Sequence, residues 1–301
     1  MNIDMMDNTG IRIGLIGSQS MHAWAFAQAC NVPDENGIYR FPDARVVAVY
    51  GVDDTPEHIR LTMEKGRIPQ TVSSMEELLE CCNAFMIIQR RGGEHMTFAE
   101  QLIKKGYPVF IDKPVCCSRE DVQKLRYLAA KNDAVLCGGS GFKYSGQIAE
   151  LKHRLAQEPF DRGVAASIIY SADMDSPYDG IFFYLPHAVE VMLELFGYDP
   201  SRVKTTVRAH NDFTVDVDYG RYTVQLVLGG SKICRVSLCG NRPQTIQIDD
   251  RDLFIGCVGH FVQAVREQRI VKDTGKLTRH VEVILAIRES IERNIEINID
   301  K

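Results

Sequence analysis

A lysine that directly follows a short buried strand is the first residue in this sequence with a clear chemical use. The run Val-Phe-Ile at residues 109–111 is brief, apolar and rich in β-branched and aromatic side chains, which predicts a buried strand. Asp112, Lys113 and Pro114 come next. Because an open parallel sheet binds ligands beyond the carboxyl ends of its strands, the Lys113 ammonium is placed where it could contact one. The alternative is a solvated lysine in a turn.

A glycine turn after the first predicted strand is the second candidate. A strand at residues 11–16, a turn at residues 17–22 and a helix reaching about Cys30 give the order of elements in a dinucleotide-binding motif. Of the three glycines in Gly-x-Gly-x-x-Gly, only the first is present, because Gln19 and His22 hold the other two positions. Backbone N–H groups at a helix start can still bind an anion, although a turn without phosphate is the alternative. We expect coenzyme contacts from Gly17, Ser18, Gln19, Ser20 and His22.

An acidic turn follows the second predicted strand, at residues 45–50. In nicotinamide-binding domains an acidic residue near this strand end binds the adenosine ribose hydroxyls. Gly51 lies at the strand end and Asp53 follows two residues later, so Asp53 is the predicted ribose ligand. The turn has no arginine for a 2′-phosphate, which favours NAD over NADP. Alternatively, Asp53 and Asp54 begin the helix that follows.

The loop after the apolar strand at residues 84–88 is also expected to border a coenzyme. Gln89 and Arg90 begin this loop, and His95 ends it. Arg90 could bind phosphate or be a surface charge, and His95 is expected to shape the loop around the nicotinamide rather than act in catalysis. We therefore predict coenzyme contacts from Gln89, Arg90 and His95.

The elements that carry these residues form two parts. Up to about residue 138, short strands alternate with helices, which is typical of a parallel sheet with right-handed crossovers. Later strands cluster, with helices before and after them, and Gly229-Gly230 predicts a hairpin turn between two of these strands. The predicted fold is α/β: an N-terminal Rossmann-like parallel sheet and a C-terminal α+β domain with a mostly antiparallel sheet. We expect a dinucleotide-binding domain at residues 1–118 and a substrate-binding and oligomerisation domain at residues 119–301.

Composition limits the classes of function. The net charge of -5 and the absence of a dense Lys/Arg block argue against nucleic-acid binding. No apolar run approaches the roughly 18 residues of a membrane span, and the acidic N-terminus is not a signal peptide. Nine cysteines, an odd number without Cys-x-x-Cys spacing, favour free thiols in a reducing cytoplasm and predict no metal site.

Taken in order, these features resemble the Gfo/Idh/MocA family of NAD(P)-dependent oxidoreductases over nearly the whole chain. The most specific segment is Val-Phe-Ile-Asp-Lys-Pro at residues 109–114, which is similar to the family's Glu-Lys-Pro motif with Asp112 in place of glutamate. His187-Ala-Val-Glu, followed by Leu-Phe-Gly at residues 195–197, is similar to the family's histidine helix. Ser140-Gly-Phe-Lys-Tyr resembles the segment that carries an arginine towards the substrate, here with Lys143.

The resemblance implies roles for these residues. Lys113 would polarise the substrate and contact the nicotinamide together with Asp112, and His187 would serve as acid or base. Lys143 would face the substrate, and Tyr184 could add a hydroxyl group. An imidazole with an ordinary pKa of about 6.5 suits proton exchange with a hydroxyl at neutral pH. The implied cofactor is NAD, with NADP as the alternative, and the implied assembly is a homodimer or homotetramer.

Two hypotheses follow. The first is an NAD(P)-dependent oxidoreductase that acts on a small polyol, sugar or related hydroxy compound. The second is a catalytically silent Rossmann-fold protein that binds a nucleotide or metabolite in a regulatory or assembly role. The changed glycine motif favours the second hypothesis, as does Phe183, which stands where sugar- and inositol-oxidising members commonly have an aspartate four residues before the histidine.

Overall fold

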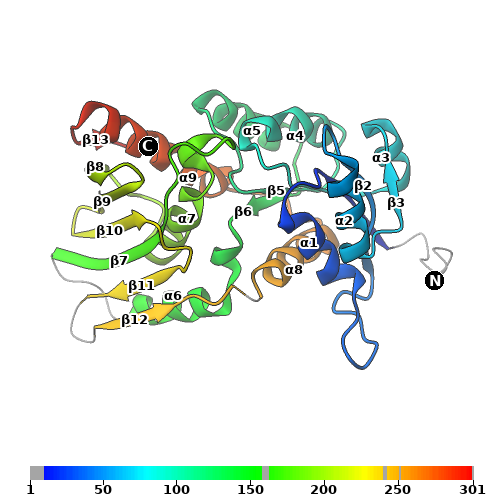
Figure 1. The fold of residues 1–301 in the computed structure, drawn as a ribbon, viewed down its shortest axis with the longest axis horizontal. Helices are drawn as coiled ribbons and strands as arrows, with labels where there is room; N and C mark the ends of the chain where they lie inside the picture. Colours follow the sequence, from blue (N-terminus) through cyan, green and yellow to red (C-terminus); the bar gives the residue numbers. More distant parts are fainter. Residues whose placement is uncertain (1–9, 158–162, 240–242, 251, 300–301) are drawn as a thin grey trace. The chain divides into compact units, whose positions relative to one another are not determined.

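The computed structural model describes residues 10–157, 163–239, 243–250 and 252–299, and within them the chain forms two units (Figure 1). The first unit contains residues 10–112, Gln123–Gly138 and Phe254–Thr274. The second contains Lys113–Val122, Gly139–Leu253 and the chain from Gly275 onward. The expected domain boundary at residues 118/119 stays a prediction.

A six-stranded sheet in the order β3-β2-β1-β4-β5-β6 forms the centre of the first unit. The pairings β1–β2, β1–β4, β2–β3 and β4–β5 are parallel, which confirms the predicted Rossmann-like sheet. The side chains of β4 and β5 are buried throughout, as the continuous apolar runs predict. The strands are β1 (Ile11–Ile16), β2 (Ala44–Tyr50), β3 (Gln70–Val72), β4 (Ala84–Ile87), β5 (Val109–Asp112) and β6 (Leu136–Gly139).

Helices connect these strands, and a helix from late in the chain completes the unit. Phe26 of α1 and Phe261 of α8 both lie against Phe110 of β5, with ring centroids 5.5 and 6.1 Å apart, so α1 and α8 share one apolar cluster with the sheet. These aromatic contacts place α8 on the N-terminal sheet although it is far away in sequence. The helices are α1 (Met21–Asn31), α2 (Pro56–Gly66), α3 (Met75–Cys81), η2 (Gly92–Glu94), α4 (His95–Lys104), α5 (Arg119–Lys131) and α8 (Leu253–Arg266).

The second unit contains a seven-stranded sheet in the order β12-β11-β7-β10-β9-β8-β13. Its neighbouring strands pair antiparallel except for β7 and β10, so the sheet is mostly antiparallel, as predicted. The hairpin predicted at Gly229-Gly230 is wrong, because β7 lies between β10 and β11. The strands are β7 (Gly163–Ser171), β8 (Arg202–Ala209), β9 (Asp212–Asp218), β10 (Tyr222–Gly229), β11 (Arg235–Leu238), β12 (Gln244–Gln247) and β13 (Ile297–Asn298).

Helix α7 is the buried helix of the second unit. It is apolar along most of its length and packs against β7 and β10, so nearly all of its residues are buried. The helices of this unit are η3 (Gly141–Tyr144), α6 (Gly146–Gln157), η4 (Gly180–Phe182), α7 (Leu185–Phe196) and α9 (Thr274–Arg293). Within the described ranges, none of the helices is both long and apolar enough to cross a membrane.

Candidate functional site

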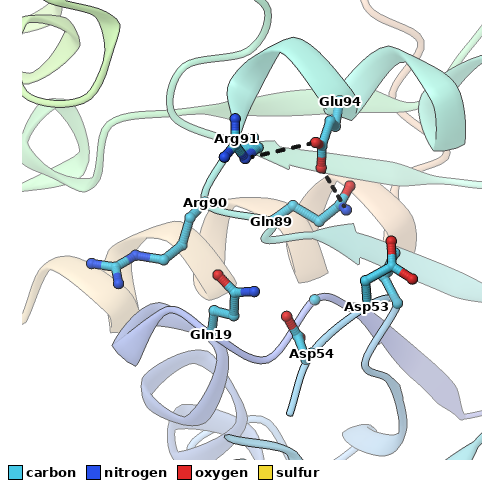
Figure 2. Close-up of a pocket in the computed structure, with 9 residues that line it drawn as sticks. Gln19, Asp53, Asp54, Gln89, Arg90, Arg91 and Glu94 are labelled. Atoms are coloured by element: carbon cyan, nitrogen blue, oxygen red, sulfur yellow. Dashed lines mark hydrogen bonds and ion pairs between the residues drawn. The ribbon is translucent and has the colours of Figure 1, made fainter. Parts of the chain in front are cut away.

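A cavity of about 190 Å³ lies in the first unit, beside the turn that follows β1 (Figure 2). It collects residues from three βα turns that lie far apart in the sequence. Five residues predicted to contact the coenzyme line it, and four others complete its wall. The lining residues are Gly17, Gln19, Val52, Asp53, Asp54, Gln89, Arg90, Arg91 and Glu94.

Gly17 is the position in this cavity that requires glycine. Its φ is +98°, and a Cβ atom there would lie 2.9 Å from the backbone nitrogen of Gln89. The turn after β1 therefore passes directly against the start of the β4–α4 loop. The first glycine of the motif is retained for this close approach, although the other two are absent.

Gln89 gives this cavity an unsatisfied polar atom. Its side-chain Nε2 donates to Glu94 at 3.4 Å, whereas its buried Oε1 has no hydrogen-bond partner among the described residues. A buried acceptor without a partner costs free energy, and a hydroxyl or amide of a bound ligand could satisfy it. This unpaired acceptor therefore fits a polar ligand with hydroxyl or amide donors, such as a dinucleotide.

The acidic residue that contacts the glycine turn is Asp54. Its Oδ2 accepts hydrogen bonds from the backbone N–H of Ser18 at 2.5 Å and from the Ser18 hydroxyl at 2.7 Å. Asp53 also lines the cavity but is exposed. Thr55 caps α2 by accepting from His58, so neither aspartate serves as the helix cap that was the alternative prediction. The Thr55-Pro56 pair was the available signal, because it supplies the helix start without using Asp54.

His22 and Asp112, two predicted coenzyme residues, form a pair in the first unit. His22 Nδ1 lies 2.7 Å from Asp112 Oδ2, and their side chains are 19% and 5% exposed. Ser20 caps α1 by accepting from the His22 backbone N–H. His22, which stands at the third glycine position of the dinucleotide motif, thus pairs with Asp112, the residue directly before Lys113.

The β4–α4 loop carries two arginines and one histidine of interest. His95 is fully buried, and its Nε2 lies 2.8 Å from the backbone oxygen of Gln89, so it braces the loop. Figure 2 shows Arg90 and Arg91 extending in different directions, with Arg91 towards Glu94, 3.9 Å away. Both arginines line the cavity, and the contacts of Arg90 and His95 with the coenzyme stay predictions.

Lys113 is anchored within the second unit. Its Nζ donates to the backbone oxygen of Phe183 at 2.9 Å and lies 4.4 Å from the centroid of the Phe183 ring. Phe183 is four residues before His187, so the carbonyl and ring of this residue hold the ammonium at the approach to α7. Lys113 is largely buried, which rules out the solvated lysine of the alternative prediction.

His187 lies in the first turn of α7 and is largely buried. Its Nδ1 is 2.7 Å from the hydroxyl of Ser140, and its ring contacts Phe142 and Tyr170 edge to face, with centroids 5.3 Å apart in both cases. This hydrogen bond and these two ring contacts fix the orientation of the imidazole. Tyr184 packs near the same cluster, with its ring centroid 6.4 Å from that of Tyr170.

Glu190 is the centre of the charged groups around this histidine. Lys143 Nζ lies 2.6 Å from Glu190 Oε2, and the Ser140 backbone N–H donates to Glu190 Oε1 at 2.9 Å. The Lys143 side chain is only 11% exposed and the Glu190 side chain only 4%. Gly139 makes room for this pair, since a Cβ there would lie 2.3 Å from Glu190. The ammonium of Lys143, predicted to face a substrate, is in this structure an ion-pair partner.

His280 of α9 completes the network. Its Nδ1 lies 3.7 Å from Glu190 Oε1, and its Nε2 accepts from the Val115 backbone N–H at 3.5 Å. Burial lowers the pKa of the His280 imidazole, while the nearby Glu190 carboxylate acts in the opposite direction. The folded protein therefore holds His280 in its neutral form.

This neutral histidine predicts a pH-dependent stability. Between the ordinary imidazole pKa of about 6.5 and the lower folded pKa, the unfolded chain binds one proton more than the folded chain. The free energy of unfolding should thus fall as pH drops below about 6.5, by at most about 1.4 kcal/mol per pH unit from this group. His280→Gln should flatten the slope in urea titrations at pH 5.5–7.5. An unchanged slope would contradict the prediction that His280 contributes to this pH dependence.

The sheet order and the cavity at the glycine turn define a dinucleotide-binding Rossmann domain. Residues 11–140 match the model of the Gfo/Idh/MocA oxidoreductase family, described as having an NAD-binding Rossmann fold. This part of the chain is similar to that family, whose description names NAD as the cofactor it binds.

Other similar proteins cover more of the chain. A Salmonella typhimurium protein, provisionally named oxidoreductase YceM, is 25% identical over 252 residues, covering 71% of this chain and 79% of that protein. Apo scyllo-inositol dehydrogenase from Lactobacillus casei is 13% identical, with a TM-score of 0.79 over 98% of this chain and 99% of its own. Myo-inositol dehydrogenase from Lactobacillus casei, in complex with NAD(H) and myo-inositol, is 14% identical, with a TM-score of 0.78 over 97% of both chains. At these identities the structural similarity shows a shared fold.

Proposed function

We propose that this protein is an NAD-dependent oxidoreductase that transfers hydride to or from a small polyol, sugar or related hydroxy compound. The observation that most directly supports this proposal is that one short segment, Phe183 to His187, both binds the Lys113 ammonium and contains His187. Hydride removal from a secondary alcohol requires a group that takes the hydroxyl proton and a group that stabilises negative charge on the oxygen, and an imidazole and an ammonium can supply these. The inositol dehydrogenases of the same fold support a polyol as the substrate class.

The residues of the second unit would perform the proton and charge chemistry. NAD supplies the hydride acceptor when bound. The Lys113 ammonium would bind the reacting oxygen and stabilise the negative charge that develops on it. His187 would exchange the hydroxyl proton, and Tyr184 and Lys143 would contribute to the surroundings of the substrate.

The residues of the first unit would bind the coenzyme. The backbone N–H groups of Gln19 and Ser20 at the start of α1 would bind the diphosphate, next to the His22–Asp112 pair, whereas those of Gly17 and Ser18 donate to the Tyr50 carbonyl and to Asp54. Gln89 and Arg90 would complete the cavity. The acidic side chains of Asp53 and Asp54 would accept ribose hydroxyls and disfavour the additional phosphate of NADP.

A thermal-shift titration with NAD, NADH, NADP and NADPH tests this proposal. A ligand that binds only the folded state raises the melting temperature, so NAD or NADH should raise it more than NADP or NADPH. A panel of polyols and sugars, followed by nicotinamide absorbance, then identifies the substrate. No shift with any of the four coenzymes would contradict the proposal.

One observation favours the second candidate, a catalytically silent nucleotide- or metabolite-binding protein. Asp54 already occupies the Ser18 backbone N–H, which belongs to the turn that would bind the coenzyme. If this carboxylate serves mainly to close the turn, it competes with a dinucleotide instead of binding one.

Asp54→Asn distinguishes the two candidates. As the oxidoreductase proposal makes Asp54 a ribose ligand, the dissociation constant for NAD should rise about tenfold, the value of one hydrogen bond to a charged group. Calorimetry measures this directly, with Glu57→Gln, at an exposed carboxylate in the first turn of α2, as the control that should leave the dissociation constant unchanged. Tighter binding of NAD in the Asp54 variant would instead favour the second candidate.

We also propose a homo-oligomer in a reducing cytoplasm. Buried side chains alternate with partly exposed ones along β9, so one face of the second sheet is open to a second copy of the chain. All nine cysteines are free thiols, which suits a reducing compartment. Light scattering after size-exclusion chromatography tests the assembly.

A further inference from the structure

Ser140 is a fully buried serine whose hydrogen bonds can be counted. Its backbone N–H donates to Glu190 Oε1 at 2.9 Å. Its Oγ accepts from the Phe142 backbone N–H at 3.3 Å and lies 2.7 Å from His187 Nδ1. The hydroxyl thus has two neighbours within hydrogen-bond distance among the described residues.

The chemistry of these neighbours fixes the direction of the Ser140–His187 bond. The Phe142 N–H is a donor only, so it cannot accept the hydroxyl hydrogen. His187 Nδ1 is the remaining acceptor, and a buried hydroxyl without an acceptor would cost free energy. The hydroxyl therefore donates to Nδ1, and the neutral ring carries its hydrogen on Nε2.

We infer that Ser140 is a positioning residue that holds His187 in its Nε2–H tautomer. This inference deepens the proposed function, since it concerns the histidine assigned to proton exchange. A carboxylate partner would do the opposite, because it accepts a hydrogen from Nδ1 and leaves Nε2 free as a base. The aromatic side chain of Phe183 provides no such carboxylate.

The surrounding charges keep Ser140 in place. Glu190 fixes the Ser140 backbone, and Lys143 holds Glu190 through the buried ion pair. This chain of contacts runs from Lys143 to the imidazole of His187. It gives Lys143 an indirect role at the site, through the orientation of the histidine.

The tautomer sets what His187 offers a substrate. With hydrogen on Nε2, the ring donates a hydrogen bond to a carbonyl or alkoxide oxygen without rearrangement. To take a hydroxyl proton at Nε2, the ring must first lose the Nε2 hydrogen and gain one at Nδ1, and the Ser140 hydroxyl must turn away. The resting enzyme is therefore arranged to bind the oxidised form of the substrate.

NMR of the 15N-histidine-labelled protein at about pH 8 tests the tautomer, because an ordinary imidazole is then neutral. The two-bond coupling pattern should identify His187 Nδ1 as the nitrogen without hydrogen, with signals assigned by their loss in His187→Asn. In Ser140→Ala, the Nδ1 signal should move towards that of a nitrogen accepting no hydrogen bond, and Ser140→Thr should restore it. A protonated Nδ1 in the neutral wild-type ring would overturn the inference.

This measurement needs no coenzyme, so it separates the inference from the proposed function. Absence of a thermal shift with NAD would reject the oxidoreductase while leaving the tautomer readable. If turnover is found, Ser140→Ala should lower kcat about 10- to 100-fold and leave the dissociation constant for NAD unchanged. An unchanged kcat would remove Ser140 from the positioning of the acid or base.

Discussion

Replacing Lys113 with methionine should lower kcat for the identified substrate about 10²- to 10³-fold while the protein remains folded. Methionine keeps most of the volume of the side chain but removes its charge. The lost interaction is the stabilisation of negative charge on the reacting oxygen, and removing one such preorganised donor costs about this factor. Nicotinamide absorbance measures the rate, and thermal denaturation checks the fold.

Two controls make this result specific. Lys124→Met removes an exposed lysine that pairs with Glu100, and this variant should retain full activity. The thermal shift with NAD should persist in Lys113→Met, which separates substrate chemistry from coenzyme binding. Turnover retained in Lys113→Met would remove Lys113 from its proposed role.

The parallel sheet of the first unit was predictable because its signals are local. Each of the strands β1, β2, β4 and β5 is a short apolar run that ends in a turn. The helices α1, α2 and α3 begin at the capping residues Ser20, Thr55 and Ser74. The three-residue strand β3 was not predicted. Its sequence, Gln-Thr-Val at residues 70–72, has too few buried side chains to give a hydrophobic pattern.

The pairing of strands in the second unit was less predictable. Gly229-Gly230 marks a real change of direction, but turn chemistry does not say which strand lies next to β10. That position belongs to β7, which precedes β10 in the chain by about fifty residues. The hairpin prediction failed because a long-range parallel pairing replaced the local antiparallel one.

The same difference between local signals and long-range contacts applies to the candidate site. Lys113 and His187 stand in sequence patterns that identify them as candidates, whereas their partners come from other elements. Glu190 meets Lys143 and the Ser140 backbone only because α7 packs beside the η3 segment. Likewise, Asp54 and not Asp53 reaches Ser18, and the positive φ of Val52 that shapes this turn gives no sequence signal.

Breaking the buried ion pair should have the largest effect on stability. Glu190→Gln removes the negative charge but keeps an oxygen that can accept from the Ser140 backbone N–H. The Lys143 ammonium is then left largely buried without its ion-pair partner, which should lower the free energy of unfolding by about 3 kcal/mol. Urea denaturation at neutral pH measures this loss.

A double-mutant cycle identifies the ion pair as the cause. If the cost of Glu190→Gln comes from the unpaired Lys143 ammonium, then adding Lys143→Met should recover more than half of the lost free energy. Glu289→Gln is the control, because Glu289 pairs with the exposed Arg293 on the surface of α9. That surface pair should contribute no more than about 1 kcal/mol. Additive losses in the Glu190/Lys143 double variant would show that the two charges do not stabilise each other.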